Sequence, residues 1–255
     1  MGKLLSTTSV TFRESIRNRT VLAILLLALG FAASALVLAA MAQDQRVRVI
    51  TDWGLFCLSA FGVGLAIILG VNLLQKEIGR KTLYVVLSRP LARWQYVLGK
   101  FLGELGVLAV EVVLLALALV VMLACEGQPV SGLLLKAMLL YAAEIALVAA
   151  WALFFSSFSS PYLSGFFTLG LFVAGRSLEV LQHLIDKVAV PWIHALLQGL
   201  FYLLPDLAAF NLAPRVVNDI AVPAGEVAAA LAYATGYGSL LVFLSCLLFS
   251  RRELA

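Results

Sequence analysis

The sequence has little charge and few of the residues that build catalytic or metal sites. Only 13% of its 255 residues are charged, and it contains three cysteines and two histidines. Soluble domains carry about 25% charged residues, so that class is excluded. Cys57, Cys125 and Cys246 lie in or beside apolar segments without C-x-x-C spacing, which favours neither a disulfide nor a metal role. His183 and His194 are interpreted as interfacial side chains rather than ligands.

Motifs for nucleotide hydrolysis and for common hydrolytic chemistry are missing as well. Residues Gly79–Thr82 resemble the end of a Walker A motif. The motif is incomplete, because no glycine stands five residues before Gly79. The sequence has no H-E-x-x-H or G-x-S-x-G motif and no carboxylate cluster for a metal. The chain is therefore predicted not to be an enzyme and to hold no cofactor or metal of its own.

Apolar residues are abundant instead. They make up 63% of the chain, and the mean hydropathy is +1.04. Soluble domains are about 45–50% apolar, so the chain is predicted to be an all-α integral membrane protein with a single transmembrane domain over residues 1–255. A spanning helix needs about 20 apolar residues. Six segments are predicted to span: 20–41, 53–74, 95–124, 133–155, 162–181 and 225–249.

Two further segments are predicted to be helices that do not cross the membrane. The basic lead-in Met1–Arg19 suits an interfacial helix with Leu5, Phe12 and Ile16 on one face, although an ordinary basic flank is the alternative. Val190–Leu204 is apolar but too short to span, so a short helix on the outer face is predicted. A seventh span there would put the C-terminal arginines outside, against the usual charge bias.

Basic residues gather in Gln75–Gly103, which holds six of the 18 Lys and Arg residues. Basic loops between spans stay on the cytoplasmic side. The inner bases are Lys3, Arg13, Arg17, Arg19, Lys76, Arg80, Lys81, Arg89, Arg93, Arg251 and Arg252, and the outer ones are Arg46, Arg48, Lys187 and Arg215. Both termini are therefore predicted to be cytoplasmic. The net charge of +4 reflects orientation in lipid rather than nucleic-acid binding.

The basic loop has internal order. Glu77–Leu87 is predicted to form a short helix across the membrane surface, because Leu83, Val86 and Leu87 fall on one face. Pro90 ends that helix, since a residue before proline avoids helical angles, and it suits the first position of the next helix. Trp94 and Tyr96 then follow as interface anchors.

These motifs carry a family resemblance. The chain resembles ABC-2-type permeases, the membrane subunits of a class of ATP-binding-cassette transporters. The matching motifs are Glu77-x-Gly79-Arg80, Leu87-Ser88-Arg89-Pro90, Arg93, Leu98-Gly99-Lys100-Phe101, Thr11-Phe12-Arg13-Glu14, Leu204-Pro205-Asp206, Phe210-Asn211 and Phe249-Ser250-Arg251-Arg252-Glu253-Leu254. Ala92 departs from the pattern, because a Ser or Thr helix cap is expected there.

The resemblance implies two permease chains in a bacterial inner membrane and two cytoplasmic ATPase chains that hold ATP and Mg. It also implies an exporter. The residues expected to couple the loop to the ATPase are Glu77, Gly79, Arg80, Arg89, Pro90 and Arg93. Two alternatives stay open on the residues alone: a stand-alone ion-coupled transporter or channel, and a membrane assembly factor without transport.

The charged residues singled out in the predicted spans are Lys100, Glu104, Glu111, Glu144, Arg176 and Glu179. A charge at the bilayer centre costs about 2.5–3.5 kcal/mol, so these side chains are expected to face the bundle and have partners. Counted at about 1.5 Å per residue, Arg176 and Glu111 lie at similar depths in the membrane, which predicts that they pair. Glu179, three residues along the same helix, is the competing partner. Gly99 and Gly103 lie beside the Lys100–Glu104 stripe and could admit a neighbouring helix.

Overall fold

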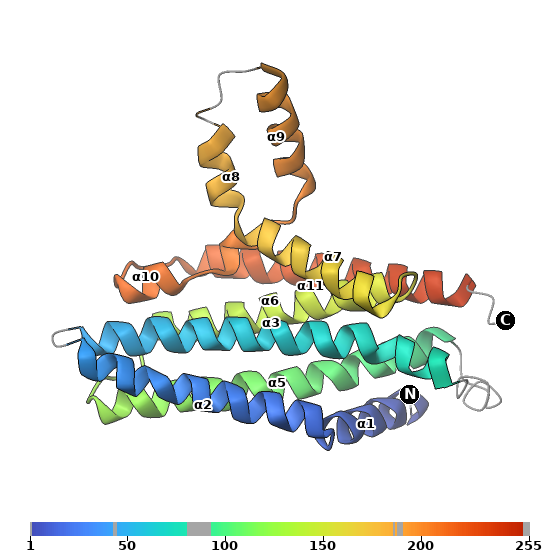
Figure 1. Cartoon of the computed structure of the whole chain (residues 1–255), viewed down its shortest axis with the longest axis horizontal. Helices are drawn as coiled ribbons and strands as arrows, with labels where there is room; N and C mark the ends of the chain where they lie inside the picture. The colour runs from blue at the N-terminus through green and yellow to red at the C-terminus, as the bar shows by residue number, and fades with distance from the viewer. Residues whose placement is uncertain (1, 43–44, 81–92, 186, 188–190, 252–255) are drawn as a thin grey trace.

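The computed structural model describes residues 2–42, 45–80, 93–185, 187 and 191–251. Within these ranges every regular element is a helix (Figure 1). In chain order they are α1 (Gly2–Ile16), α2 (Arg19–Met41), α3 (Arg46–Arg80), α5 (Arg93–Cys125), α6 (Gly132–Ser156), α7 (Pro161–Arg176), α8 (Leu178–Ile185), α9 (Pro191–Leu203), η1 (Ala208–Phe210), α10 (Ala213–Val217) and α11 (Ala224–Arg251).

Five helices are long and apolar enough to cross a membrane. They cover Arg19–Met41, Arg46–Leu73, Arg93–Cys125, Gly132–Ser156 and Ala224–Ser250. These correspond to five of the six predicted spans, and they run alongside one another in one bundle (Figure 1). The prediction of an all-α, multi-pass membrane protein is therefore confirmed.

The predicted span 162–181 is not one continuous helix. α7 ends at Arg176 after 16 residues, a length of about 24 Å against a hydrocarbon core of about 30 Å. The returning chain packs against this end: Leu207 N donates to Gly175 O at 3.3 Å, and a Cβ at Gly175 would lie 2.7 Å from Pro205 O. This contact ends the helix at a position that hydropathy alone does not reveal. The count of six spans stays a prediction.

α8 and α9 form a hairpin that stands across the direction of the long helices (Figure 1). α9 covers most of the residues of the short helix predicted over Val190–Leu204. Its place on the outer face of the membrane stays a prediction. The chain then returns through η1 and α10 to the start of α11.

The second long helix begins earlier than expected. α3 starts at Arg46, seven residues before the predicted start of its span. Tertiary contacts stabilise this extension: Ile50 is fully buried, and Arg46 pairs with Glu126 at 3.5 Å. At its other end α3 continues through Arg80, so Glu77–Arg80 do not begin a separate helix. The rest of the predicted coupling helix, residues 81–87, lies outside the described residues, as do Arg89 and Pro90.

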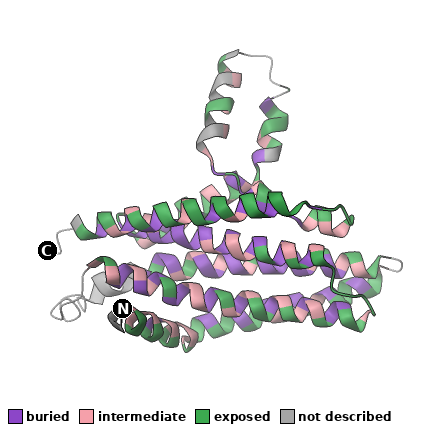
Figure 2. Ribbon diagram, turned by 180° about the vertical axis from the view of Figure 1, so that it is seen from behind, coloured by how far each residue is buried: buried purple, intermediate pink, exposed green. Residues whose placement is uncertain are grey.

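α6 lies at the centre of the bundle. In an 18-residue apolar stretch of α6, 67% of the residues are buried, against 28% in α2 and in α11. Figure 2 shows the buried residues gathered along the inner helices and the exposed ones along the outer helices. Polar side chains on α6 are therefore placed where only other protein groups can satisfy them.

The glycines of α5 receive α1. A Cβ at Gly99 would lie 3.0 Å from Thr7 Cβ, and one at Gly103 would lie 2.7 Å from Thr11 Cβ. The prediction that these glycines admit a neighbouring helix is confirmed, and the helix is the N-terminal one. α1 does not present the predicted apolar face as a unit, because Leu5 is 64% exposed whereas Phe12 packs on the core.

Candidate functional site

α6 presents two buried polar side chains, Tyr141 and Glu144, to its neighbours. Residues three apart lie on one face of a helix, and both are almost completely inaccessible, with exposures of 1% and 0%. A buried polar group without a partner costs free energy. The surrounding helices therefore have to supply the partners.

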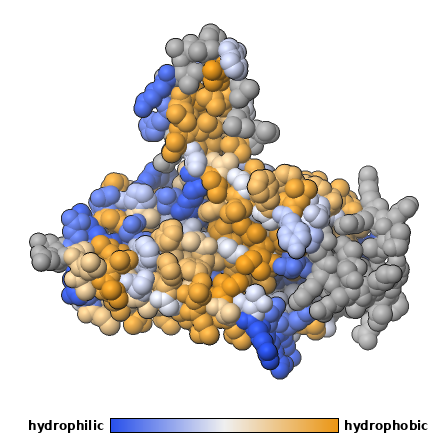
Figure 3. Space-filling model, viewed as in Figure 1, coloured by the Kyte–Doolittle hydropathy of each residue, from blue (hydrophilic) through white to orange (hydrophobic). Residues whose placement is uncertain are grey.

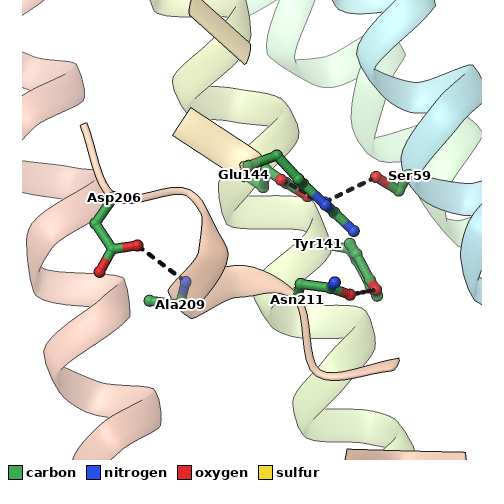
Figure 4. A network of polar contacts seen from close by, with 7 residues as sticks. Ser59, Tyr141, Glu144, Asp206, Ala209 and Asn211 are labelled. Atoms are coloured by element: carbon green, nitrogen blue, oxygen red, sulfur yellow. Dashed lines mark hydrogen bonds and ion pairs between the residues drawn. The ribbon is translucent and has the colours of Figure 1, made fainter. Parts of the chain in front are cut away.

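Arg176, the last residue of α7, supplies the partner of Glu144. One of its guanidinium nitrogens lies 2.5 and 2.7 Å from the two carboxylate oxygens of Glu144 and also donates to Ser59 Oγ on α3 at 3.2 Å. Ser59 and Glu144 come together in this way from different helices (Figure 4). The ion pair therefore joins α3, α6 and α7 inside the bundle.

The predicted pairing of Arg176 with Glu111 is wrong. α7 packs on α6 and α3, and a pairing with Glu111 would require it to face α5. Counting residues gives the depth of a side chain in the membrane, but it does not give the direction in which the helix faces. Glu179 belongs to the separate helix α8, and its side chain lies outside the described part of the chain.

The network extends from Arg176 toward the chain that returns from the hairpin. The guanidinium carbon lies 5.4 Å from the ring centre of Tyr141 and 5.9 Å from that of Phe172, within the range of a cation–π contact. Tyr141 donates its hydroxyl proton to Asn211 Oδ1 at 2.8 Å (Figure 4). Asn211 belongs to a motif that carried the family resemblance, and it ties the returning segment to α6.

A pocket of about 630 Å³ adjoins this network. Its wall includes Asn211, Tyr233 and Asp206, together with residues of α8 and α9. Asp206 accepts a hydrogen bond from Ala209 N at 3.3 Å, which holds the turn before η1 (Figure 4). The pocket lies between the base of the hairpin and the bundle and is bordered by both polar and apolar groups. Such a site can bind a ligand and respond to a movement of the hairpin.

A comparison with protein families identifies the family to which the chain belongs. Residues 10–254 match the family described as ABC-2 family transporter protein. The chain belongs to the ABC-2 transporter family. Members are membrane subunits of ABC transporters, are not themselves nucleotide-binding enzymes, and generally work with an ATPase subunit. Among curated proteins, none shows significant sequence similarity to this chain.

The permease also buries two carboxylates on α5. Glu104 and Glu111 have exposures of 1% and 0%, and within the described residues no donor lies within hydrogen-bonding distance of their oxygens. Glu104 packs over Gly70 of α3, where a Cβ would lie 3.3 Å from its Oε1. Lys100, one turn before Glu104, donates to Leu73 O at 3.3 Å and lies 5.2 Å from the ring centre of Tyr96. These three residues face the bundle as expected, but they do not join the Arg176 network.

Four of the predicted coupling residues, Glu77, Gly79, Arg80 and Arg93, lie at one end of the permease bundle. Glu77, Gly79 and Arg80 belong to the last turn of α3, although their side chains are outside the described part. Arg93 begins α5 and donates to Ser250 O of α11 at 3.2 Å. The start of α5 is therefore fastened to the end of α11.

Sequence reasoning missed several residues that the permease structure uses. Ser59, Tyr141 and Asn211 complete the Arg176 network. The only sequence signal of Ser59 and Tyr141 is that they are polar residues inside predicted spans, and Asn211 was noted only as part of the Phe210-Asn211 motif. Lys136 was also missed, although it lies inside the predicted span 133–155. Its Nζ donates to Val222 O at 2.8 Å and so holds the loop before α11.

Proposed function

We propose that the chain is the membrane subunit of an ABC exporter in a bacterial inner membrane, with both termini in the cytoplasm. It moves its substrate with energy from ATP that a separate subunit hydrolyses with Mg. The family match over residues 10–254 of a multi-helix bundle carries this proposal. A membrane-spanning belt is consistent with Figure 3, in which hydrophobic surface covers the middle of the bundle and hydrophilic surface lies toward the α10 end.

The ATPase docks at the end of the bundle where α3 ends and α5 begins. The end of α11 and the start of α1 lie at the same end (Figure 1). This end carries much of the chain's basic charge, including Arg80 and Arg93, which supports a cytoplasmic position by the positive-inside rule. The docking residues are Glu77, Gly79, Arg80, Arg89, Pro90 and Arg93.

Movement of the ATPase reaches the membrane through α5. This helix has 33 residues, a length of about 50 Å. α1 packs on its glycines, and Arg93 ties it to α11. A push at the loop therefore moves α1, α5 and α11 together. α6 and α7 are held to each other by the Arg176–Glu144 pair, which also contacts α3 through Ser59.

A second permease chain packs against the α8–α9 hairpin and the surfaces beside it. Val180, Leu184 and Trp192 of the hairpin are 61%, 50% and 70% exposed. Among the described residues, the hairpin packs on little of its own chain besides the end of α7. A neighbouring chain at this position covers apolar surface on both of its helices and completes the adjacent pocket.

The coupling proposal is tested by reversing one charge. The chain is co-expressed with a candidate ABC ATPase subunit, and the complex is reconstituted in lipid. Glu77→Lys is expected to abolish the effect of the permease on ATP hydrolysis while the chain still inserts and folds. Asp52→Lys, at an exposed position near the opposite end of α3, is the matched control and should keep it. Equal coupling in both variants would remove Glu77 from the ATPase contact.

The orientation is tested with native cysteines. Cys125, at the end of α5 away from Arg93, is exposed, whereas Cys57 is buried. In a Cys246→Ser background, a membrane-impermeant maleimide is expected to label Cys125 from outside intact cells. A cysteine introduced at Ala255 should react only after the membrane is opened. The reverse pattern would contradict cytoplasmic termini and, with them, the docking end.

A further inference from the structure

An apolar groove of about 820 Å³ runs between α5 and α11, and α6 forms its floor. Its volume lies within the range of about 300–1,000 Å³ typical of small-molecule sites. This groove is separate from the Arg176 network and from the pocket at the hairpin base. Its walls are hydrocarbon almost throughout, with Leu98, Phe101, Leu105, Val242, Phe243 and Leu247 among the lining residues.

Small residues leave the groove open. Ala143, Ala146 and Ala150 of α6 line the floor at spacings of three and four residues, which places them on one face of the helix. Gly238 of α11 lines the opposite wall. A Cβ atom added at Gly238 would have Leu147 Cδ1 as its nearest neighbour, at 3.8 Å. Larger side chains at these positions would occupy the space, so the sequence keeps a cavity here.

The groove has the length of one membrane leaflet. Its lining on α5 runs from Arg93 to Leu105, and its lining on α11 runs from Ser250 back to Ala234. At about 1.5 Å per residue these stretches measure about 18 and 24 Å. Half of a hydrocarbon core of about 30 Å, plus part of the headgroup region, covers the same depth. The groove therefore begins at the membrane surface and ends near the bilayer centre.

The mouth and the interior of the groove differ in chemistry. Arg93 and Trp94 line the mouth, and Trp94 is 51% exposed. Arginine keeps its positive charge at physiological pH and binds phosphate through several N–H donors, while tryptophan favours the headgroup level. Positive charge at one end of a leaflet-long apolar groove complements an anionic phospholipid.

We propose that this groove binds one anionic glycerophospholipid from the leaflet at the Arg93 end. An acyl chain fills the space over Ala143, Ala146 and Ala150, and the phosphate and headgroup lie against Arg93 and Trp94. The bound lipid fills the gap between α5 and α11 that direct helix packing leaves open. This site does not depend on the direction of transport or on the identity of the ATPase.

The test uses the full chain purified in mild detergent and an equimolar mixture of palmitoyl-oleoyl phosphatidylglycerol and phosphatidylcholine. Native mass spectrometry counts the lipids that each chain retains. The wild-type chain is expected to retain one lipid, mainly phosphatidylglycerol. Gly238→Leu displaces at least two acyl methylenes from the groove, so we expect the affinity to fall roughly tenfold. Gly236→Leu is the matched control, because Gly236 lies two residues away on α11 and outside the groove lining.

A charge variant separates the headgroup contact from the acyl contact. Arg93→Gln is expected to retain a lipid but to lose the preference for phosphatidylglycerol, whereas Arg93→Lys should keep part of it. Circular dichroism checks that Gly238→Leu folds, and Ala146→Leu replaces it if it does not. Equal lipid retention in Gly238→Leu and Gly236→Leu would overturn the proposal. So would a lipid-free dimer that Gly238→Leu separates into monomers, because the groove would then hold a second chain.

Discussion

The two long helices α5 and α6 both carry buried carboxylates. The one on α6 accepts hydrogen bonds from a charged partner, whereas within the described residues those on α5 accept none. Glu144 of α6 lies between Arg176 of α7 and the helices around it, within 2.7 Å of the guanidinium. Glu111 of α5 is equally buried, yet within the described residues no donor reaches its oxygens. Burial is thus the same for both side chains, and the difference lies in what the neighbouring helix brings to them.

This difference shows which part of the bundle is specified by polar contacts. The Arg176 pair specifies how α3, α6 and α7 lie, because a shift of α6 or α7 leaves a buried charge unpaired and a shift of α3 breaks the hydrogen bond to Ser59. α5 instead packs through shape: its glycines at 99, 103 and 106 admit α1 closely. Packing of this kind depends on the fit of the two helix surfaces and not on a buried charge.

The largest effect is expected from breaking the ion pair of α6. Arg176→Met leaves Glu144 buried without its partner, and such a loss costs about 3–5 kcal/mol. Thermal unfolding in detergent measures it. Arg176→Met combined with Glu144→Gln should recover part of the loss, because no unpaired charge remains. In the double variant of Arg176→Met and Glu111→Gln, the two losses of stability should be additive. Recovery of stability in that double variant would instead support the Arg176–Glu111 pairing predicted from depth.

A smaller loss is expected from filling the glycine face of α5. A Cβ at Gly103 meets Thr11 Cβ at 2.7 Å and Thr8 O at 2.8 Å, so Gly103→Ala forces α1 to shift. Overpacking of this kind costs about 1–3 kcal/mol. Limited proteolysis should then cut α1 faster. Gly64→Ala on α3 is the control, since nothing lies within 4 Å of its built Cβ. Equal protection of α1 in both variants would contradict this packing.

An effect of opposite sign is expected at Glu111. Replacing a buried polar group that has no partner removes a desolvation cost of about 1–3 kcal/mol. Glu111→Met should therefore raise the melting temperature, whereas Glu144→Met should lower it because Arg176 loses its partner. A Glu111→Met variant that is as unstable as Glu144→Met would mean that Glu111 has a partner of its own, and the contrast between α5 and α6 would fail.

The smallest effect is expected at the edge of the network. Tyr141→Phe keeps the ring beside Arg176 and loses the hydrogen bond to Asn211, which is worth about 0.5–1.5 kcal/mol. Asn211→Ala in the Tyr141→Phe background should then add little. Hydrogen exchange of residues 206–212 reports the release of this segment. Full additivity of the two substitutions would show that the hydroxyl contact contributes nothing.

The family, the membrane class and five spanning helices follow from the sequence. Long apolar runs identify spans because lipid leaves the backbone no partner except itself, and this reason is local to each segment. The motifs around Glu77, Arg93 and Asn211 carried the family resemblance before any contact was known, and the match over residues 10–254 agrees. The spacing of Gly99 and Gly103 by itself also predicted a close contact with a neighbouring helix.

Tertiary structure decided the partners and the places where helices end. α7 ends at Arg176 because the chain returning near Pro205 packs against Gly175, and α3 starts at Arg46 because its first turns pack on neighbours. Arg176 meets Glu144 rather than Glu111, since depth along a helix does not determine its rotation or its neighbours. Rotation and neighbours depend on how all the helices pack at once, and no single segment of the sequence contains that information.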